Sequence, residues 1–285
     1  MPDATLPDAL FPWTTLTAVF LVVLGPAAGI PVVARLVRPR DQLAAELLDQ
    51  RSTVIALALA VLATAAALFA ATSPTELLRA TFDASALASP ASITAKLLAL
   101  ELVLLVLRLV LSPKHRAADG VVALALAANS AALAVAPGFV IARSWPSLLT
   151  DTAGAAALML STALVVGAAA KLALTHLVPG IIEHDGRFPE RATRVMIAAL
   201  VAELILTVAF SQVPRLDRSP HTLALYRLYG GAGAPIFWPF VVVIGVIAPG
   251  IALWFRAKTK NAALAIAAAA VIGVCALRWL LFTVH

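Results

Sequence analysis

Apolar runs long enough to cross a lipid bilayer dominate this chain and limit the folds that it can adopt. Eight such runs follow one another, at residues 13–35, 52–73, 92–112, 120–142, 152–173, 192–213, 236–255 and 261–283. A membrane-spanning helix needs about 20 apolar residues, and a lone strand cannot satisfy its backbone hydrogen bonds in hydrocarbon. The sequence therefore predicts an all-α, polytopic membrane protein whose eight transmembrane helices form a single membrane domain over residues 1–285.

Composition supports a lipid bilayer as the solvent of this chain. Hydrophobic residues make up 62% of the 285 residues and charged residues only 13%, whereas soluble domains are about one quarter charged. The net charge of +6 would suggest nucleic acid in a soluble protein. Here the basic residues cluster at the ends of apolar runs, so we interpret them as topology signals and expect no nucleic-acid partner.

Cysteine and histidine usage excludes several redox centres. The single Cys275 cannot supply an iron–sulfur cluster, a CxxCH haem attachment or an internal disulfide. All five histidines fall in predicted loops or at helix ends, so no imidazole pair faces another inside the bundle. The run Glu183-His184-Asp185 is interpreted as a solvated loop. We therefore expect no haem, no iron–sulfur cluster and no metal site within this chain.

The distribution of Lys and Arg predicts the orientation. Fourteen of them follow the first, third, fifth and seventh runs: Arg35, Arg38, Arg40, Arg51, Arg108, Lys114, Arg116, Lys171, Arg187, Arg191, Arg194, Arg256, Lys258 and Lys260. The opposite face carries five: Arg79, Arg143, Arg215, Arg218 and Arg227. The positive-inside rule then places both termini outside the cytoplasm. We expect a multi-pass protein of the bacterial inner membrane.

Two long outer connections remain between the predicted helices. They span residues 74–91 and 214–235 and are expected to be either flexible connectors or docking loops for a partner.

Few ionisable or amide side chains interrupt the apolar runs, and these are candidates for function. A charge at the bilayer centre costs about 2.5–3.5 kcal/mol on insertion scales. Glu101, Asn129 and Glu203 lie in mid-run, and Arg278 lies nearer the outer surface. Glu203 has no charged neighbour within two helical turns, so it needs a partner on another helix or stays protonated. Either state suits proton transfer, and a structural hydrogen bond between helices is the alternative.

Two more charged side chains share the third run with Glu101. Arg108 is seven residues away on the same helix face, which allows a water-bridged pair near the inner surface. Lys96 lies on another face and is expected to extend toward the outer surface. We predict that Glu203, Glu101, Arg278 and Asn129 form the proton-transfer set.

The seventh run carries the strongest resemblance to a known family. Its segment Phe-Trp-Pro-Phe-Val-Val-Val-Ile-Gly-Val-Ile-Ala-Pro, residues 237–249, resembles the FW-x-x-VV-x-x-G-x-x-x-P signature of the NrfD/PsrC membrane subunits of polysulfide and nitrite reductase systems. Similar positions elsewhere are Ser89-Pro90, Pro137-Gly138, Arg143-Ser-Trp145, Ser161, Gly167, Glu203 and Arg278-Trp279. The ordered set covers nearly the whole chain, although no single motif is diagnostic.

The resemblance implies a fold of two packed four-helix bundles and a place in a larger complex. Such a subunit anchors a ferredoxin-like iron–sulfur subunit and a molybdopterin-type catalytic subunit on its outer face. It carries no redox cofactor of its own and binds a quinone, menaquinone or ubiquinone, near that face. Where better-known members place Asn and His in the first helix, this chain has threonines, and Ala136 replaces a Tyr. The quinone donors expected here are Trp13, Thr14, Thr17 and Arg143, because a quinone carbonyl needs only a hydrogen-bond donor.

The function that follows is exchange of electrons between the quinone pool and a peripheral iron–sulfur protein, with proton transfer through buried acids. Two alternatives stay open. One is a secondary transporter or ion-translocating subunit that uses the same carboxylates. The other is a purely structural anchor without a quinone site.

Overall fold

A computed structural model describes residues 15–83, 90–111, 116–144, 152–217, 228–254 and 259–283. Within these ranges every regular element is helical. The helices are α1 (Thr15–Leu36), α2 (Gln42–Ala70), α3 (Pro74–Phe82), α4 (Pro90–Leu111), α5 (Arg116–Ser144), α6 (Thr152–Leu177), α7 (Ile181–His184), α8 (Phe188–Asp217), α10 (Ala234–Ile236), the π-helix η3 (Phe237–Ile247), α11 (Ala248–Trp254) and α12 (Lys260–Thr283). The prediction of an all-helical chain is confirmed for this part of the molecule.

Seven of the described helical segments are long and apolar enough to cross a membrane. They are α1, α2, α5, α6, α8, the continuous unit α10–η3–α11, and α12. The helix α4 coincides with the predicted third span and has 22 residues, which include Lys96, Glu101 and Arg108; it is not among the seven. A multi-pass membrane architecture follows from these segments.

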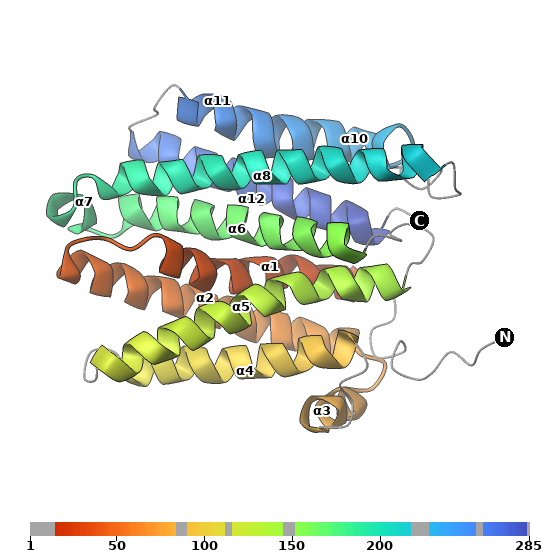
Figure 1. Ribbon diagram of the computed structural model, residues 1–285, viewed down its shortest axis with the longest axis horizontal. Coiled ribbons are helices and arrows are strands. Elements are labelled where there is room, and N and C mark those ends of the chain that lie inside the picture. Colours follow the sequence, from red (N-terminus) through yellow and green to blue (C-terminus); the bar gives the residue numbers. More distant parts are fainter. Residues whose placement is uncertain are drawn as a thin grey trace.

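The long helices run antiparallel to one another along the longest axis of the molecule (Figure 1). The first residue of α1 and the last residue of α12 lie at the same end, together with α3; we call this the α3 end (Figure 1). The opposite end carries α7 and the connection from α1 to α2, and we call it the α7 end (Figure 1). The basic residues of the predicted inner face, such as Arg35, Arg191 and Lys260, belong to helices that begin or finish at the α7 end.

Two elements differ from the predicted boundaries for local reasons. The helix α2 begins at Gln42 rather than near residue 52, because the Asp41 carboxylate accepts a hydrogen bond from the N–H of Ala44 at 2.9 Å and caps a polar first turn. The helix α3 occupies part of the predicted connection 74–91. Ser73 caps its first turn and Pro74 is its first residue, a position where proline costs no hydrogen bond.

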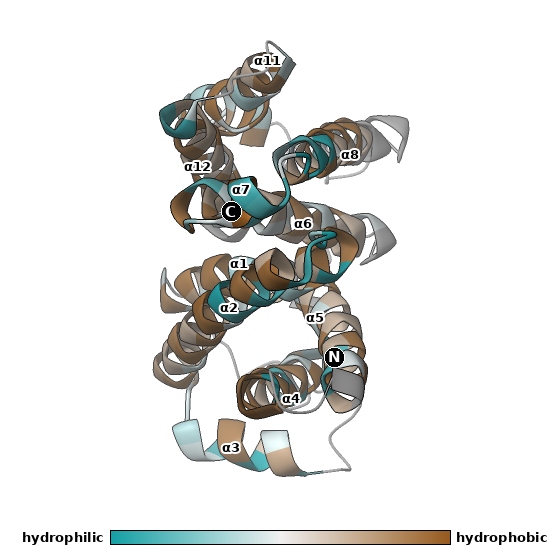
Figure 2. Cartoon of the chain, turned by 90° about the vertical axis from the view of Figure 1, so that its left-hand side faces the viewer, coloured by the Kyte–Doolittle hydropathy of each residue, from teal (hydrophilic) through white to brown (hydrophobic). Residues whose placement is uncertain are grey.

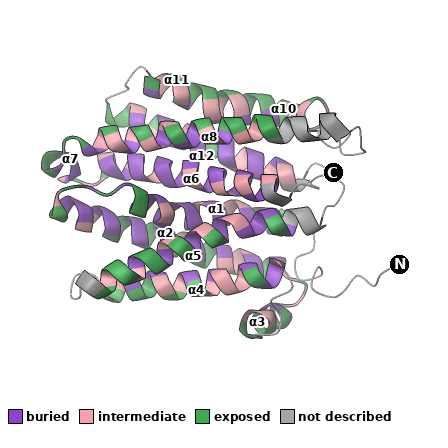
Figure 3. Ribbon diagram, in the orientation of Figure 1, coloured by how far each residue is buried: buried purple, intermediate pink, exposed green. Residues whose placement is uncertain are grey.

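The helix α6 lies at the centre of the molecule and packs against α1, α5, α8 and α12. Figure 3 shows α1 and α6 mostly buried, whereas α4, α5 and α8 present exposed faces. The contact between α1 and α6 depends on two glycines. A Cβ atom on Gly29 would lie 1.9 Å from the carbonyl oxygen of Ala163, and one on Gly167 would lie 2.2 Å from the carbonyl oxygen of Gly29. Only glycine lets the two backbones approach so closely.

The segment that resembles the NrfD/PsrC signature forms the π-helix η3. Its wider hydrogen-bonding pattern extends to the N–H of Ala248, which donates to the carbonyl oxygen of Val243. It crosses α12 at a second glycine pair, because a Cβ atom on Gly245 would lie 2.6 Å from the Cα atom of Gly273. π-helical segments often mark functional sites. At the start of η3, the Trp238 indole donates to the carbonyl oxygen of Tyr229 at 2.8 Å.

Large apolar side chains cover the outside of the helices, as a lipid-facing surface requires. Figure 2 shows predominantly hydrophobic helices, with hydrophilic residues concentrated at α7 and at neighbouring helix ends. Exposed examples are Leu62, Phe69, Val103, Val110, Val121, Ile205 and Ile251. The polar groups described next lie behind this apolar surface.

Candidate functional site

The first buried polar cluster joins α4 and α5 in the middle of both helices. Glu101 has no exposed surface. Its Oε2 atom accepts a hydrogen bond from Asn129 Nδ2 at 2.7 Å, and its Oε1 atom lies 2.6 Å from Ser130 Oγ. Asn129 Nδ2 also donates to the carbonyl oxygen of Leu97 at 3.0 Å. The structure therefore brings together two residues of the predicted proton-transfer set, Glu101 and Asn129.

The donors and acceptors in this cluster bear on the protonation state of Glu101. Ser130 Oγ lies 2.6 Å from Glu101 Oε1 and also 2.6 Å from the carbonyl oxygen of Leu126. A serine hydroxyl has one hydrogen to donate, whereas an ionised carboxylate and a carbonyl can only accept. Both contacts are satisfied when Glu101 carries a proton and donates it to Ser130, which in turn donates to Leu126. The geometry thus favours a neutral Glu101 in the bilayer interior.

The second cluster surrounds Arg278 of α12, which is completely buried. Its Nε atom donates to Thr162 Oγ1 at 3.1 Å, and one terminal nitrogen donates to the carbonyl oxygen of Leu21 at 2.8 Å. The other terminal nitrogen donates to Thr162 Oγ1 and to the carbonyl oxygen of Met159, both at 2.9 Å. The guanidinium therefore connects α12 with α1 and α6 through neutral acceptors.

Gly25 provides the space for this guanidinium. A Cβ atom at that position would lie 2.4 Å from Arg278 Cζ, well inside van der Waals contact. The missing side chain of Gly25 therefore makes room for a charge. No local sequence signal could have revealed this role, because the two residues belong to the first and last helices.

Glu203 lies near the middle of α8 and is only 2% exposed. Both α8 and α12 pack on α6. Glu203 thus lies on a helix that shares a neighbour with the helix of Arg278, whereas Glu101 belongs to a separate cluster between α4 and α5.

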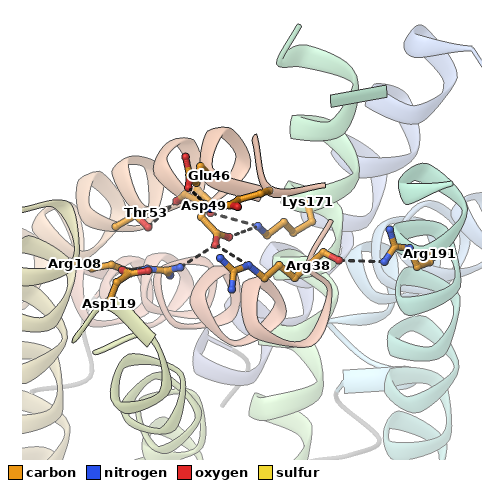
Figure 4. Close-up of polar contacts among 10 residues, drawn as sticks. Arg38, Glu46, Asp49, Thr53, Arg108, Asp119, Lys171 and Arg191 are labelled. Carbon is orange, nitrogen blue, oxygen red and sulfur yellow. Dashed lines mark hydrogen bonds and ion pairs between the residues drawn. The ribbon is translucent and has the colours of Figure 1, made fainter. Parts of the chain in front are cut away.

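A third cluster lies toward the α7 end and centres on Asp49 of α2 (Figure 4). Three cations surround its carboxylate: Arg108 at 3.2 Å, Lys171 at 3.6 Å and Arg38 at 3.6 Å. Arg108 also pairs with Asp119 at 3.8 Å. The described ion pairs of Arg108 therefore involve Asp49 and Asp119, not the water-bridged pair with Glu101 that its spacing suggested. This network joins α2, α4, α5, α6 and the connection between α1 and α2.

A small polar cavity of about 20 Å³ adjoins this network. Its lining includes Arg35, Arg38, Asp49, Arg108 and Asp119. The Oδ1 atoms of both aspartates are buried and have no hydrogen-bond partner. A cavity of this size has room for about one water molecule.

Asp185 stabilises the α7 end and is not the solvated loop residue that the sequence suggested. Its carboxylate accepts the backbone N–H of Arg40 at 2.8 Å and a guanidinium N–H of Arg191, and only 9% of the residue is exposed. Burial alone would raise the pKa of Asp185, but the hydrogen bonds from Arg40 and Arg191 and the positive charge of Arg191 outweigh it. The pKa of Asp185 therefore lies below its ordinary value.

The predicted quinone-binding residues are only partly within the described structure. Trp13 and Thr14 lie outside the described residues, and so does the side chain of Arg143, whose backbone belongs to α5. Thr17 is described and is 2% exposed. It precedes by one helical turn the Leu21 carbonyl that binds Arg278. Thr17 is thus a hydroxyl beside the Arg278 cluster, in the part of α1 nearest the α3 end.

Several residues of these clusters were missed by sequence analysis. Asp49 lay before the predicted start of the second helix, and Lys171 was counted only as an inner-face charge. Lys171 is nevertheless 1% exposed. A signal was available for it, because Lys171 stands inside an Ala- and Leu-rich run where a charge is costly. Ser130 directly follows Asn129 in the sequence, so its hydroxyl could have been recognised as part of the same polar interruption of the apolar run.

Comparisons with known proteins do not identify a family for this chain. No protein-family model matches it, and neither a curated protein nor a solved structure gives a significant match.

Proposed function

We propose that this chain is the membrane subunit of a respiratory oxidoreductase complex, and that its buried acids carry the protons of quinone chemistry. In this proposal electrons pass between the quinone pool and a peripheral iron–sulfur subunit at the α3 end, and a molybdopterin-type subunit completes the complex. The observation that supports it most is the buried hydrogen-bonded chain that joins Glu101, Ser130 and the carbonyl oxygen of Leu126.

The proposed architecture has eight spans in two bundles within a bacterial inner membrane. One bundle consists of α1, α2, α4 and α5, which contact one another as a closed ring. The other consists of α6, α8, the α10–η3–α11 unit and α12, and α6 and α12 also pack on α1. The charges of α4 are compatible with a span, because Glu101 and Arg108 are buried and Lys96 binds the carbonyl oxygen of Ala80. Both termini then lie outside, at the α3 end.

The proposed function requires the protein to bind a quinone and to accept protons near its ring. Oxidation of a quinol releases two electrons and two protons, so a group near the ring must accept a proton as the electrons leave. Thr17 fits the role of a hydroxyl donor to a quinone carbonyl, and it lies next to the Arg278 cluster. Glu203 is a buried acid on α8, which packs on α6 as the Arg278-bearing α12 does. We propose Glu203 as the proton acceptor. Glu101 and Asn129 form a second proposed proton-binding site.

The test begins with isolation of the tagged full-length chain from its native membrane under mild conditions. The proposal expects an iron–sulfur protein to co-purify, and the complex to oxidise a short-chain quinol in the presence of a soluble electron acceptor. We expect Glu203→Gln to abolish this turnover while the subunits still assemble. Glu183→Gln, on the exposed surface of α7, is the matched control and should leave turnover unchanged.

Different outcomes overturn different parts of the proposal. A chain that purifies alone contradicts the complex. An assembled complex without inhibitor-sensitive quinol oxidation indicates a structural anchor. Unchanged turnover in Glu203→Gln removes Glu203 from the proton path and assigns it a structural role.

One observation favours a second candidate function, an ion-translocating subunit. Asn129 Oδ1 is buried without a hydrogen-bond partner, on the side chain whose Nδ2 atom binds Glu101. Oxygen ligands of this kind suit a small hard cation that exchanges with a proton. Proteoliposomes of the isolated chain should then take up sodium in exchange for protons, and Glu101→Gln should abolish the uptake.

A further inference from the structure

The short helix α3 differs from the long helices in its direction and in the distribution of its side chains. It lies crosswise beneath the bundle, whereas the spans run along the long axis (Figures 1 and 2). It follows α2 after three residues, since α2 ends at Ala70 and α3 begins at Pro74. An element that directly follows a membrane span and turns across it lies at the level where that span leaves the hydrocarbon.

The sequence of α3 divides its surface into three faces. At 100° per residue, Leu77 and Ala80 point in one direction and Leu78 and Phe82 in a neighbouring one. The remaining face carries Glu76, Arg79 and the following Asp83. Leu77 is buried in the core, whereas Leu78 is 51% exposed and Phe82 is 82% exposed. One face thus packs on the protein, one is polar, and an apolar face between them is uncovered.

Polar contacts fix α3 in this orientation. Lys96 Nζ donates to the carbonyl oxygen of Ala80 at 2.8 Å and to Ser92 Oγ at 2.9 Å. Ser92 Oγ donates to the same carbonyl at 2.9 Å. These bonds tie the last turn of α3 to the first turns of α4, and a cation near a helix C-terminus is electrostatically favourable. The exposed apolar face therefore has a defined direction and is not a consequence of a loose segment.

We propose that α3 is an interfacial helix that inserts Leu78 and Phe82 among the lipid acyl chains at the membrane surface. Lipid is the expected occupant because Phe69, in the last turn of α2, is 76% exposed, so lipid-facing surface continues from the span up to α3. The polar face then lies among headgroups and water, where Arg79 can pair with lipid phosphate. The helix would set the depth and tilt of α2 and α4, the two spans that it connects. This inference does not depend on the proposed function.

Accessibility of single spin labels in the full-length protein tests the proposal. Cys275→Ser provides a background without native thiols. Phe82→Cys and Leu78→Cys report on the apolar face, and Glu76→Cys and Arg79→Cys report on the polar face. Each labelled protein is reconstituted into phosphatidylglycerol–phosphatidylethanolamine vesicles, and collisions with oxygen and with a water-soluble nickel chelate are compared. Val61→Cys in α2 is the lipid-facing control, and Glu183→Cys at the α7 end is the aqueous control.

We expect labels at positions 78 and 82 to favour oxygen, as position 61 does, and labels at positions 76 and 79 to favour the nickel chelate, as position 183 does. Nickel accessibility at 78 and 82 equal to that at 76 would place α3 in water and overturn the proposal. Protection of positions 78 and 82 from both reagents would show that protein covers this face, which overturns it as well. If Phe82→Cys does not fold, Leu78→Cys decides alone, since both side chains belong to the same face.

Discussion

The Oε1 atom of Glu101 in α4 and the hydroxyl oxygen of Ser130 in α5 lie 2.6 Å apart in the buried interior. Because the same hydroxyl lies 2.6 Å from the carbonyl oxygen of Leu126, the contact is satisfied by a proton on the carboxyl group. Two helices are thus joined through a buried acid, and a neutral carboxyl group accounts for both short contacts of Ser130. This relationship leads directly to a difference between substitutions at Glu101.

Glu101→Gln should preserve the fold, whereas Glu101→Ala should not. A glutamine side chain can still donate to Ser130 and accept from Asn129, so we expect a change in the free energy of unfolding below about 1 kcal/mol. Alanine leaves a cavity and removes the carboxyl group that binds Asn129 and Ser130, so that Asn129 keeps only its hydrogen bond to Leu97; this should cost about 3 kcal/mol. Thermal unfolding in detergent measures both. Infrared absorption of a protonated carboxylic acid should also disappear in Glu101→Gln; its absence from the wild type would contradict a neutral Glu101.

Gly25→Ala should displace the Arg278 guanidinium. The added methyl group would lie 2.4 Å from Arg278 Cζ, so one or more of the hydrogen bonds to Leu21, Met159 and Thr162 must break. A buried charged donor without its acceptor costs about 2 kcal/mol or more. The control is Gly250→Ala in α11, where an added Cβ meets no atom within 4 Å. Equal melting temperatures for both variants would show that Arg278 does not need this space.

Asp49→Asn should strongly destabilise the protein. Lys171 has a side chain that is 1% exposed and would lose its counter-charge, and removal of one partner from a buried pair costs about 3–5 kcal/mol. Arg38→Gln breaks a pair in which the arginine is 51% exposed, so it should cost less than about 1 kcal/mol. The two variants are compared by thermal unfolding at constant salt. A smaller loss for Asp49→Asn than for Arg38→Gln would contradict the central role of Asp49.

Asp185 should make stability dependent on pH in the acidic range. Its pKa in the folded protein lies below the ordinary value of 3.8, because hydrogen bonds from Arg40 and Arg191 outweigh the opposing effect of burial. The resulting stabilisation is fully present above pH 3.8 and is lost as the pH falls through the folded-state value. At neutral pH, Asp185→Asn should therefore melt at a lower temperature than the wild type. The difference should shrink on acidification; a constant difference down to the lowest accessible pH would contradict this assignment.

The main features of the fold were predictable from the sequence because their signals are local. Apolar runs of membrane-spanning length coincide with the described long helices, and the basic residues that indicate orientation cluster at successive run ends. The cost of burying a charge likewise identified Glu101, Asn129, Glu203 and Arg278 as unusual, and the structure describes all four as buried. The helix α3 was missed because it is short and because only tertiary packing buries Leu77.

What the sequence determined by itself is that this chain is helical, belongs in a membrane and contains a few buried ionisable groups. Tertiary structure alone decided which of these groups meet. Glu101 bonds to Asn129 across 28 residues of sequence, and Arg278 bonds to Leu21 across 257. The physical reason is that the spans are rich in Ala and Leu on all sides, so periodicity does not reveal which face packs inward. The partners of each polar group are therefore set by close contacts between helices, such as that of Gly25 with Arg278, and not by any local pattern.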